Sequence, residues 1–237
     1  MAGQNLLSLF GLLILVWNAG SIKSNLTEFK HYIYKARPNI VCLCETWLSL
    51  NDNFEIAGYK VIRNDRFGRG GGVAILVDKS ILSRSHETFV YYDGGFLETL
   101  VVQVQVNHYW ADVCVMYNPC KSVTDGEFMH YFNRFSRDAF VCGDLNAHHP
   151  SWSMDSTTRT LLNGTGSALA GVLLQNNFSL LTPPGTVTHL DRRSNSRSTI
   201  DLAFGTGIFA TTDKVESEHM LGSDHVPVVY CYNFLPN

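Results

Sequence analysis

The order of apolar and polar residues predicts many strands and few helices. Strict alternation over Glu98–Val106, and short apolar runs elsewhere, are typical of strands. The helical spacing of Leu26, Phe29 and Ile33 predicts a helix over Ser24–Ala36. Further helices are predicted over Phe128–Phe135 and Leu161–Asn176, and the predicted strands are Leu12–Trp17, Asn39–Glu45, Tyr59–Ile62, Gly72–Val77, Glu98–Val106, Ala111–Tyr117, Ala139–Cys142, Phe178–Leu181, Thr186–His189, Ile200–Phe204 and Val226–Tyr232.

This series of elements favours a layered α/β fold with mixed sheets. A doubly wound parallel sheet would need a helix after nearly every strand, and the pattern lacks those helices. We therefore expect a four-layered α/β sandwich, in which two largely antiparallel sheets pack face to face with helices outside. No linker, repeat or low-complexity segment divides the chain, so residues 1–237 are expected to form one domain with its core at residues 12–232.

Composition narrows the class of protein. The chain has 237 residues, of which 45% are hydrophobic and 16% charged, as expected for an ordered globular protein. Its formal net charge of −3 argues against a nucleic-acid coat protein held by bulk positive charge. Any DNA-binding surface must therefore be a local basic patch.

The apolar stretch Leu6–Trp17 raises the question of secretion. No Lys or Arg precedes it, and it is too short to span a bilayer. We expect a buried first strand there, and a protein that is neither secreted nor inserted in a membrane. The six cysteines form no CxxC pair, which favours free thiols over disulfides.

Polar residues stand at the ends of the predicted strands. A single Asp after a strand is usually a turn residue or helix cap, but turn chemistry alone does not account for so many such positions. Strand ends in a layered sheet converge on a cleft, so we expect these side chains to meet. The residues are Asn18, Glu45, Tyr117, Asp144 with Asn146, Asp201, and Asp224 with His225.

These residue types suit the hydrolysis of a phosphodiester. A hard divalent cation would need oxygen ligands, which Glu45 and Asn18 offer. Asp144, beside Asn146, could orient and deprotonate a water molecule. His225 could contact the phosphate while Asp224 binds its other ring nitrogen. The residues leave open whether His225 acts as a general base or stabilises the transition state.

Taken together, the strand-end motifs resemble a known superfamily. Trp17-Asn18, Glu45-Thr46, Tyr117-Asn118-Pro119, Gly143-Asp144-Leu145-Asn146, Ser198-Thr199-Ile200-Asp201 and Ser223-Asp224-His225 resemble, in order, the motifs of the endonuclease/exonuclease/phosphatase superfamily, which includes DNase I and the exonuclease III-type abasic-site endonucleases. Within it, the chain is most similar to the endonuclease domains of non-LTR (LINE-type) retrotransposons. That likeness is carried by Asn18–Ile22, Arg69–Ala74, Gly143–His149 and Trp152, and the resemblance extends from about Leu12 to Tyr230.

The resemblance implies an endonuclease that nicks one DNA strand with Mg²⁺ or, in its place, Mn²⁺. The products would be a 3′-hydroxyl, which primes target-primed reverse transcription, and a 5′-phosphate. It implies that Asn18 and Glu45 hold the metal and that Tyr117 contacts the phosphate. Asp144 with Asn146 would orient the water, and Asp201 would act near the leaving group. His225 would be oriented by Asp224. Many relatives carry Asn or Asp where this chain has Gly20, which leaves the metal shell open.

A polar segment before Asp201 is the candidate DNA-binding element. Arg192, Arg193 and Arg197 lie within Asp191–Ser198, which composition alone allows to be a solvated hairpin tip. The resemblance favours a hairpin that enters a DNA groove. Further DNA contacts are predicted for Thr188, His148 and Ser223.

The expected partners follow from the same resemblance. They are double-stranded DNA and a reverse transcriptase domain in cis, because we expect the chain to be one domain of a longer polyprotein. As an isolated domain it is expected to be a monomer, made in the cytoplasm and acting on nuclear DNA. The alternatives are an abasic-site repair endonuclease or another phosphoesterase of the superfamily, a catalytically inactive DNA-binding module, and a secreted DNase-like glycoprotein.

Overall fold

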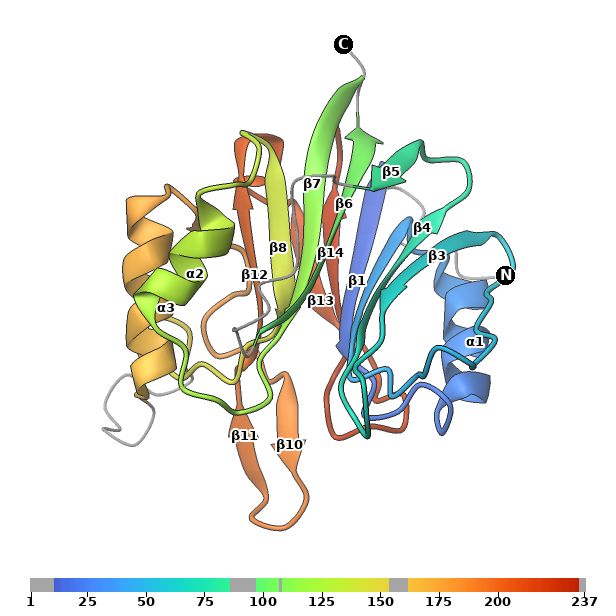
Figure 1. Ribbon diagram of the computed structural model, residues 1–237, viewed down its shortest axis with the longest axis horizontal. Helices are drawn as coiled ribbons and strands as arrows, with labels where there is room; N and C mark the ends of the chain where they lie inside the picture. Colours follow the sequence, from blue (N-terminus) through green and yellow to red (C-terminus); the bar gives the residue numbers. More distant parts are fainter. Residues whose placement is uncertain (1–10, 86–96, 107, 154–161, 235–237) are drawn as a thin grey trace, which may run out of the picture.

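The structure is a computed structural model that describes residues 11–85, 97–106, 108–153 and 162–234. Within these residues, two six-stranded sheets pack face to face and helices cover their outer sides (Figure 1). The first sheet has the order β13-β14-β1-β2-β4-β3, formed by Lys214–Ser217, Val228–Tyr232, Leu12–Asn18, Ile40–Cys44, Val73–Asp78 and Tyr59–Asn64. The second has the order β5-β6-β7-β8-β12-β9, formed by Ser83–Ser85, Glu98–Val106, Tyr109–Tyr117, Ala139–Asp144, Asp201–Thr206 and Ser179–Leu180.

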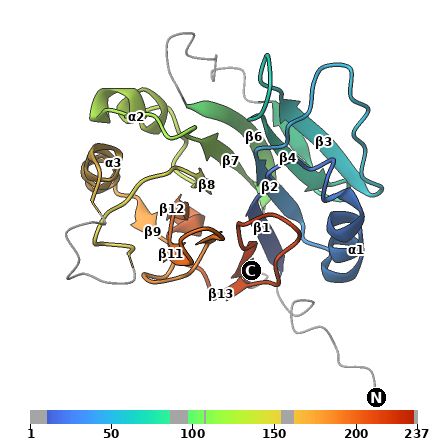
Figure 2. The same ribbon diagram turned by 90° about the horizontal axis from the view of Figure 1, so that it is seen from below.

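Alternation along the strands builds the layers. Ile14 and Val16 of β1 face the second sheet and meet Val102 and Phe140 in the central core. The intervening residues of each strand face the helices, so both sides of each sheet are apolar. Helix α1 (Leu26–Ala36) covers the first sheet, and α2 (Asp125–Phe132) with α3 (Gly164–Gln175) covers the second (Figure 2). The predicted four-layered sandwich is confirmed.

Strand directions bring the candidate residues to one end of the molecule. β1 and β2 are parallel, as are β7 and β8, so Asn18, Cys44, Tyr117 and Asp144 all lie at strand ends of the same polarity. β12 is antiparallel to β8 with Asp201 opposite Asp144, so it begins at that end. A hairpin of β10 (His189–Asp191) and β11 (Ser196–Ser198) projects from the same end (Figure 1).

Several element boundaries differ from the sequence prediction. The strand expected over Thr186–His189 begins only at His189, because Thr188 and its neighbours are held by irregular contacts to the next strand. β5 and β13 were not predicted, since their polar sequences lack an apolar run and both are edge strands. α2 begins at Asp125, preceded by a capping box of Thr124 and Glu127. Leu161, the predicted start of α3, lies outside the described residues.

Two further expectations can be compared with the structure. All six cysteines are free, as predicted, and every one except Cys120 is buried. Among the residues that the structure describes, no helix has the length and apolar character needed to cross a membrane.

Two glycines of α3 provide a matched test of how this helix packs. A Cβ atom added at Gly166 would lie 2.0 Å from the carbonyl oxygen of His148, whereas one at Gly171 would meet nothing within 4 Å. We expect Gly166→Ala to lower the free energy of unfolding by about 1–3 kcal/mol through overpacking. Gly171→Ala should raise it by about 0.5–1 kcal/mol, because alanine favours a helix over glycine. Urea unfolding of both variants measures this; equal effects would contradict the close approach of α3 to the His148 loop.

Candidate active site

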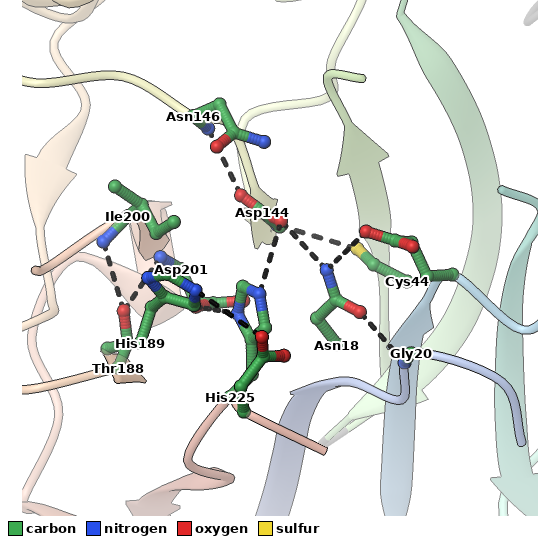
Figure 3. Close-up of polar contacts among 12 residues, drawn as sticks. Asn18, Gly20, Cys44, Asp144, Asn146, Thr188, His189, Ile200, Asp201 and His225 are labelled. Carbon is green, nitrogen blue, oxygen red and sulfur yellow. Dashed lines mark hydrogen bonds and ion pairs between the residues drawn. The ribbon is translucent and has the colours of Figure 1, made fainter. Parts of the chain in front are cut away.

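The centre of the site is a buried carboxylate, Asp144, at the end of β8 (Figure 3). Its Oδ2 accepts a hydrogen bond of 2.8 Å from Nδ2 of Asn18, and its Oδ1 accepts one of 3.1 Å from the backbone N–H of Asn146. The side-chain amide of Asn146 instead donates to the carbonyl of Asn118. Asn146 therefore supports Asp144 through its backbone, in a left-handed conformation with φ of 46°.

Asn18 bridges two carboxylates. Its Nδ2 donates to Asp144 and also to Oε1 of Glu45, at 3.0 Å. The amide orientation is fixed because its oxygen accepts the backbone N–H of Gly20, which can only donate. In this arrangement the oxygen of Asn18 is turned away from the two carboxylates, and its role as a metal ligand stays a prediction.

The remaining oxygen atoms suit a divalent cation. Glu45 is half-buried, with Oε2 bonded to the indole of Trp47 at 3.0 Å, and stands beside the buried Asp144 through their shared partner Asn18. Oδ1 of Asp201 is buried with no hydrogen-bond partner among the described residues. Asp144, Asp201 and His225 each direct a ligand atom to within 4.8 Å of the others. Carboxylate oxygens of this kind are what a hard cation prefers.

His225 forms a buried pair with Asp201. Its Nδ1 lies 2.8 Å from Oδ2 of Asp201, and its Nε2 lies 3.9 Å from Oδ2 of Asp144. This corrects one prediction, because Asp201 orients His225, a role that was expected of Asp224. The action of Asp201 near the leaving group stays a prediction. Adjacent side chains of an extended chain point in different directions. The Asp224 side chain is 48% exposed, and its carboxylate lies 3.7 Å from Nε2 of His189.

Burial and neighbouring charges raise the pKa of both Asp144 and His225. Burial, followed by the charge of Asp201, raises the pKa of Asp144 to about 8. Burial alone would lower the pKa of His225, but the charge and hydrogen bond of Asp201 outweigh it and raise this pKa to about 9. At neutral pH, His225 therefore stays protonated, and Asp144 has the proton affinity of a base that works near neutrality.

Tyr117 ends β7 at the edge of this cluster. Burial, with the nearby Glu45 carboxylate, raises its pKa, so the hydroxyl remains a hydrogen-bond donor at neutral pH. The guanidinium of Arg66 lies 5.6 Å from the ring centre and forms an ion pair with Glu98. The Tyr117 side chain is buried and its hydroxyl interacts with Glu45, so its contact with a phosphate stays a prediction.

Two predicted DNA contacts, Thr188 and Ser223, are wrong for the same reason. Both side chains are buried, and their hydroxyls are committed to the backbone. Oγ1 of Thr188 accepts the N–H groups of Ile200 and Asp201, each at 3.0 Å, and so fixes the start of β12. Oγ of Ser223 donates to the carbonyl of Asn18 at 2.8 Å, which joins the final loop to β1.

The other predicted DNA contacts are accessible. Arg192, Arg193 and Arg197 are exposed on the β10–β11 hairpin, and Arg192 also donates to the carbonyls of Gly222 and Ser223 at 3.3 Å. His148 is half-buried in the loop after β8, held by its backbone N–H to the side chain of Asn163 at 3.0 Å. DNA binding by these residues stays a prediction.

Sequence reasoning missed His189 and Trp47. The ring of His189 lies 4.6 Å from that of His225, centre to centre, and Trp47 binds Glu45 directly. The sequence prediction placed His189 at the end of a strand and gave it no chemical role. Its position just before the predicted arginine-rich hairpin was the available clue. Trp47 follows the Glu45-Thr46 motif and offered no feature other than that position.

Comparison with known proteins gives consistent matches. The model of the Endonuclease/Exonuclease/phosphatase family matches residues 15–225. The chain is 26% identical over 223 residues to a probable RNA-directed DNA polymerase from transposon X-element of Drosophila melanogaster; the match covers 91% of this chain and 23% of that protein. The chain thus spans about a quarter of the length of this relative.

Solved structures share the fold. The endonuclease domain of TRAS1, a telomere-specific non-LTR retrotransposon, matches with a TM-score of 0.75 and 19% identity, over 94% of this chain and 98% of that one. An AP endonuclease from Archaeoglobus fulgidus matches with a TM-score of 0.71 and 19% identity, over 94% and 100%. A 3′-5′ exonuclease from Neisseria meningitidis matches with a TM-score of 0.70 and 15% identity, over 94% and 100%.

Proposed function

The chain belongs to the endonuclease/exonuclease/phosphatase family, and from this we propose that it is a divalent-metal-dependent endonuclease that nicks one strand of double-stranded DNA. The observation that carries the proposal is the arrangement around Asp144. One buried carboxylate is held by Asn18, faces His225 at 3.9 Å, and lies at the end of the molecule that carries the arginine-rich hairpin. The likeness to a retrotransposon protein and to the TRAS1 domain favours a non-LTR element as its source.

The residues divide the work of phosphodiester hydrolysis. Asp144 accepts a proton from the attacking water, whose oxygen forms the new bond to phosphorus as the bond to the 3′ oxygen breaks. Protonated His225, held by Asp201 at 2.8 Å, stabilises negative charge on the phosphate oxygens. A divalent cation near Glu45, when bound, neutralises charge on the phosphate and the departing oxygen. The departing 3′ oxygen takes a proton from solvent water, so the products are a 3′-hydroxyl and a 5′-phosphate.

Substrate choice separates the proposal from its nearest alternative. An abasic-site repair enzyme would cut a duplex with an abasic site far faster than intact DNA, whereas the proposed enzyme relaxes intact supercoiled plasmid. We expect nicked circles with Mg²⁺ and none after chelation with EDTA. Cleavage confined to abasic duplex would favour the repair reading, and binding without cleavage by either substrate would favour an inactive DNA-binding module.

The hairpin arginines provide a separate test of DNA recognition. Arg193 and Arg197 are exposed, and the structure describes no contact that commits either guanidinium. The double variant Arg193→Ala/Arg197→Ala is expected to weaken DNA binding and to reduce the salt slope of binding by about 2, because each phosphate contact contributes about 1. The measurement is DNA affinity against salt concentration.

Its matched control removes two arginines at the opposite end of β8. Arg134 and Arg137 precede this strand, whereas Asp144 ends it. The variant Arg134→Ala/Arg137→Ala has the same change in net charge but should keep the parent salt slope. Equal slopes for both double variants would show that the hairpin makes no phosphate contacts.

The biological setting is proposed on the same basis. The Drosophila relative is a polymerase several times longer than this chain, which supports a reverse transcriptase domain in cis. The 3′-hydroxyl at the nick would then prime synthesis on nuclear DNA. We also propose that the endonuclease is a single domain that acts as a monomer when isolated.

A further inference from the structure

His189 and Asp224 lie beside His225, so three side chains of the types that bind metals meet next to Asp144 and Asp201. His189 and His225 face each other in an antiparallel bridge, flanked by hydrogen bonds from Leu190 N to Asp224 O (2.9 Å) and from Val226 N to Thr188 O (2.8 Å). This is the pair type without mutual hydrogen bonds, in which side chains approach most closely. Their ring centres are 4.6 Å apart (Figure 3).

Each of the three side chains has a possible ligand atom close to the other two. Nδ1 of His189 lies 3.3 Å from the hydroxyl of Ser198, so Nε2 is the atom that faces Asp224, at 3.7 Å from its Oδ2. Nδ1 of His225 is occupied by Asp201, which leaves Nε2. Each of the three residues offers a ligand atom within 4.8 Å of the others, and the side chains of His189 and Asp224 are 24% and 48% exposed.

We propose that His189, Asp224 and His225 form a second metal site, which takes Zn²⁺ or a chemically similar transition-metal ion. Two imidazole nitrogens and one carboxylate select such an ion over Mg²⁺, which prefers oxygen ligands. Tetrahedral Zn²⁺ binds at about 2.0–2.2 Å, which places neighbouring ligand atoms about 3.4 Å apart. Small side-chain movements bring the present separations to that value, and the exposed side leaves room for water as the fourth ligand.

Occupation of this site should block the reaction. The ion would bind Nε2 of His225, the same atom that faces Asp144 at 3.9 Å, and would displace its proton. His225 could then no longer present a positive charge or an N–H group to a phosphate. Zinc is therefore an inhibitor that acts apart from the cation at Glu45. This consequence rests on the proposed nuclease function, whereas zinc binding itself does not.

Zinc binding is tested first, by calorimetric titration of Zn²⁺ into the whole chain in excess Mg²⁺. Loss of an outer-sphere partner lowers the metal affinity of a site by about 10–100-fold. His189→Gln and Asp224→Asn each remove a direct ligand, so each should weaken zinc binding by about 100-fold or more. Co²⁺ in place of Zn²⁺ should give the intense visible absorption of tetrahedral coordination. The matched control is His149→Gln, a nearby histidine packed on Trp152 at 5.0 Å, which should bind zinc like the parent.

Inhibition is then measured as the zinc concentration that halves nicking, relative to the zinc-free rate of each variant. We expect that concentration to rise about 100-fold in His189→Gln and Asp224→Asn, in step with the loss of binding. Parent-like zinc affinity in both variants would overturn the site, and would place the ion with Asp144 and Asp201 instead. Weakened binding with unchanged inhibition would overturn the inhibitory role. If the parent nicks no DNA, the proposed function fails, while calorimetry still decides the metal site.

Discussion

Asp144→Asn is expected to lower the rate of DNA nicking by about 10³–10⁴-fold, the upper part of the range for loss of a general base. The amide keeps the shape of the carboxylate and can still accept the hydrogen bond from Asn18, but it cannot take a proton from water. The measurement is the single-turnover rate on supercoiled plasmid. As a matched control, the exposed Asp125→Asn at the start of α2 should keep the parent rate.

The stability of the Asp144→Asn variant shows whether its loss of nicking comes from the missing base or from misfolding. The raised pKa of Asp144 means that the folded state favours the protonated carboxyl. The stability contributed by that proton is present below the unfolded pKa and is lost as pH rises through about 8. Asp144→Asn mimics the neutral form, so it should be at least as stable as the parent at pH 8. An inactive and clearly less stable variant would attribute the loss to misfolding.

The second large effect is expected from Asp201→Asn, which should lower nicking by about 10²–10³-fold, as for loss of a preorganised electrostatic contact. Without the charge of Asp201, the largest contributions that raise the pKa of His225 are lost, and this pKa falls from about 9. A larger fraction of His225 is then neutral at pH 8 than in the parent. The defect should therefore be larger at pH 8 than at pH 6.

The pH profile also decides the role of His225, which the sequence left open. If protonated His225 stabilises the transition state, the alkaline fall of the parent rate lies near its pKa of about 9 and moves to lower pH in Asp201→Asn. A variant whose rate instead rises with pH, and approaches that of the parent at pH 8, would identify neutral His225 as the base. Asp224→Asn is the matched control. It should leave the alkaline limb close to that of the parent, because Asp224 raises the pKa of His225 less than Asp201 does.

Much of the fold was predictable because burial on both faces of the sheets imposes a strong pattern. The alternation in β6 and the apolar runs of β1 and β2 are direct consequences of a central core with helices outside. The polar edge strand β13 was not predictable in this way. Its residues are half-buried or exposed, and its register is set by pairing with β14, from which a loop separates it in the sequence.

The candidate site was predictable as a set of residues but not as a set of contacts. Their positions at strand ends identified Asn18, Glu45, Asp144, Asp201 and His225. The parallel strands end at one edge of the sandwich, and the antiparallel strand β12 begins at the same edge. The partner of His225 depends on which way each side chain points, which the Asp224-His225 sequence does not show. The roles of Thr188 and Ser223 depend on backbone N–H groups that need a hydroxyl acceptor, and these appear only when the loops are folded.

The chemistry of the cut ends tests the central claim most directly. Intact supercoiled plasmid is incubated with the protein and Mg²⁺, and the nicked circles are treated with DNA ligase and, separately, with a DNA polymerase. Hydrolysis at the Asp144–His225 site predicts that ligase reseals the circles and that polymerase extends them without prior phosphatase treatment, since each nick carries a 3′-hydroxyl and a 5′-phosphate. Absence of nicks in the parent, or nicks that neither enzyme can use, would contradict the account.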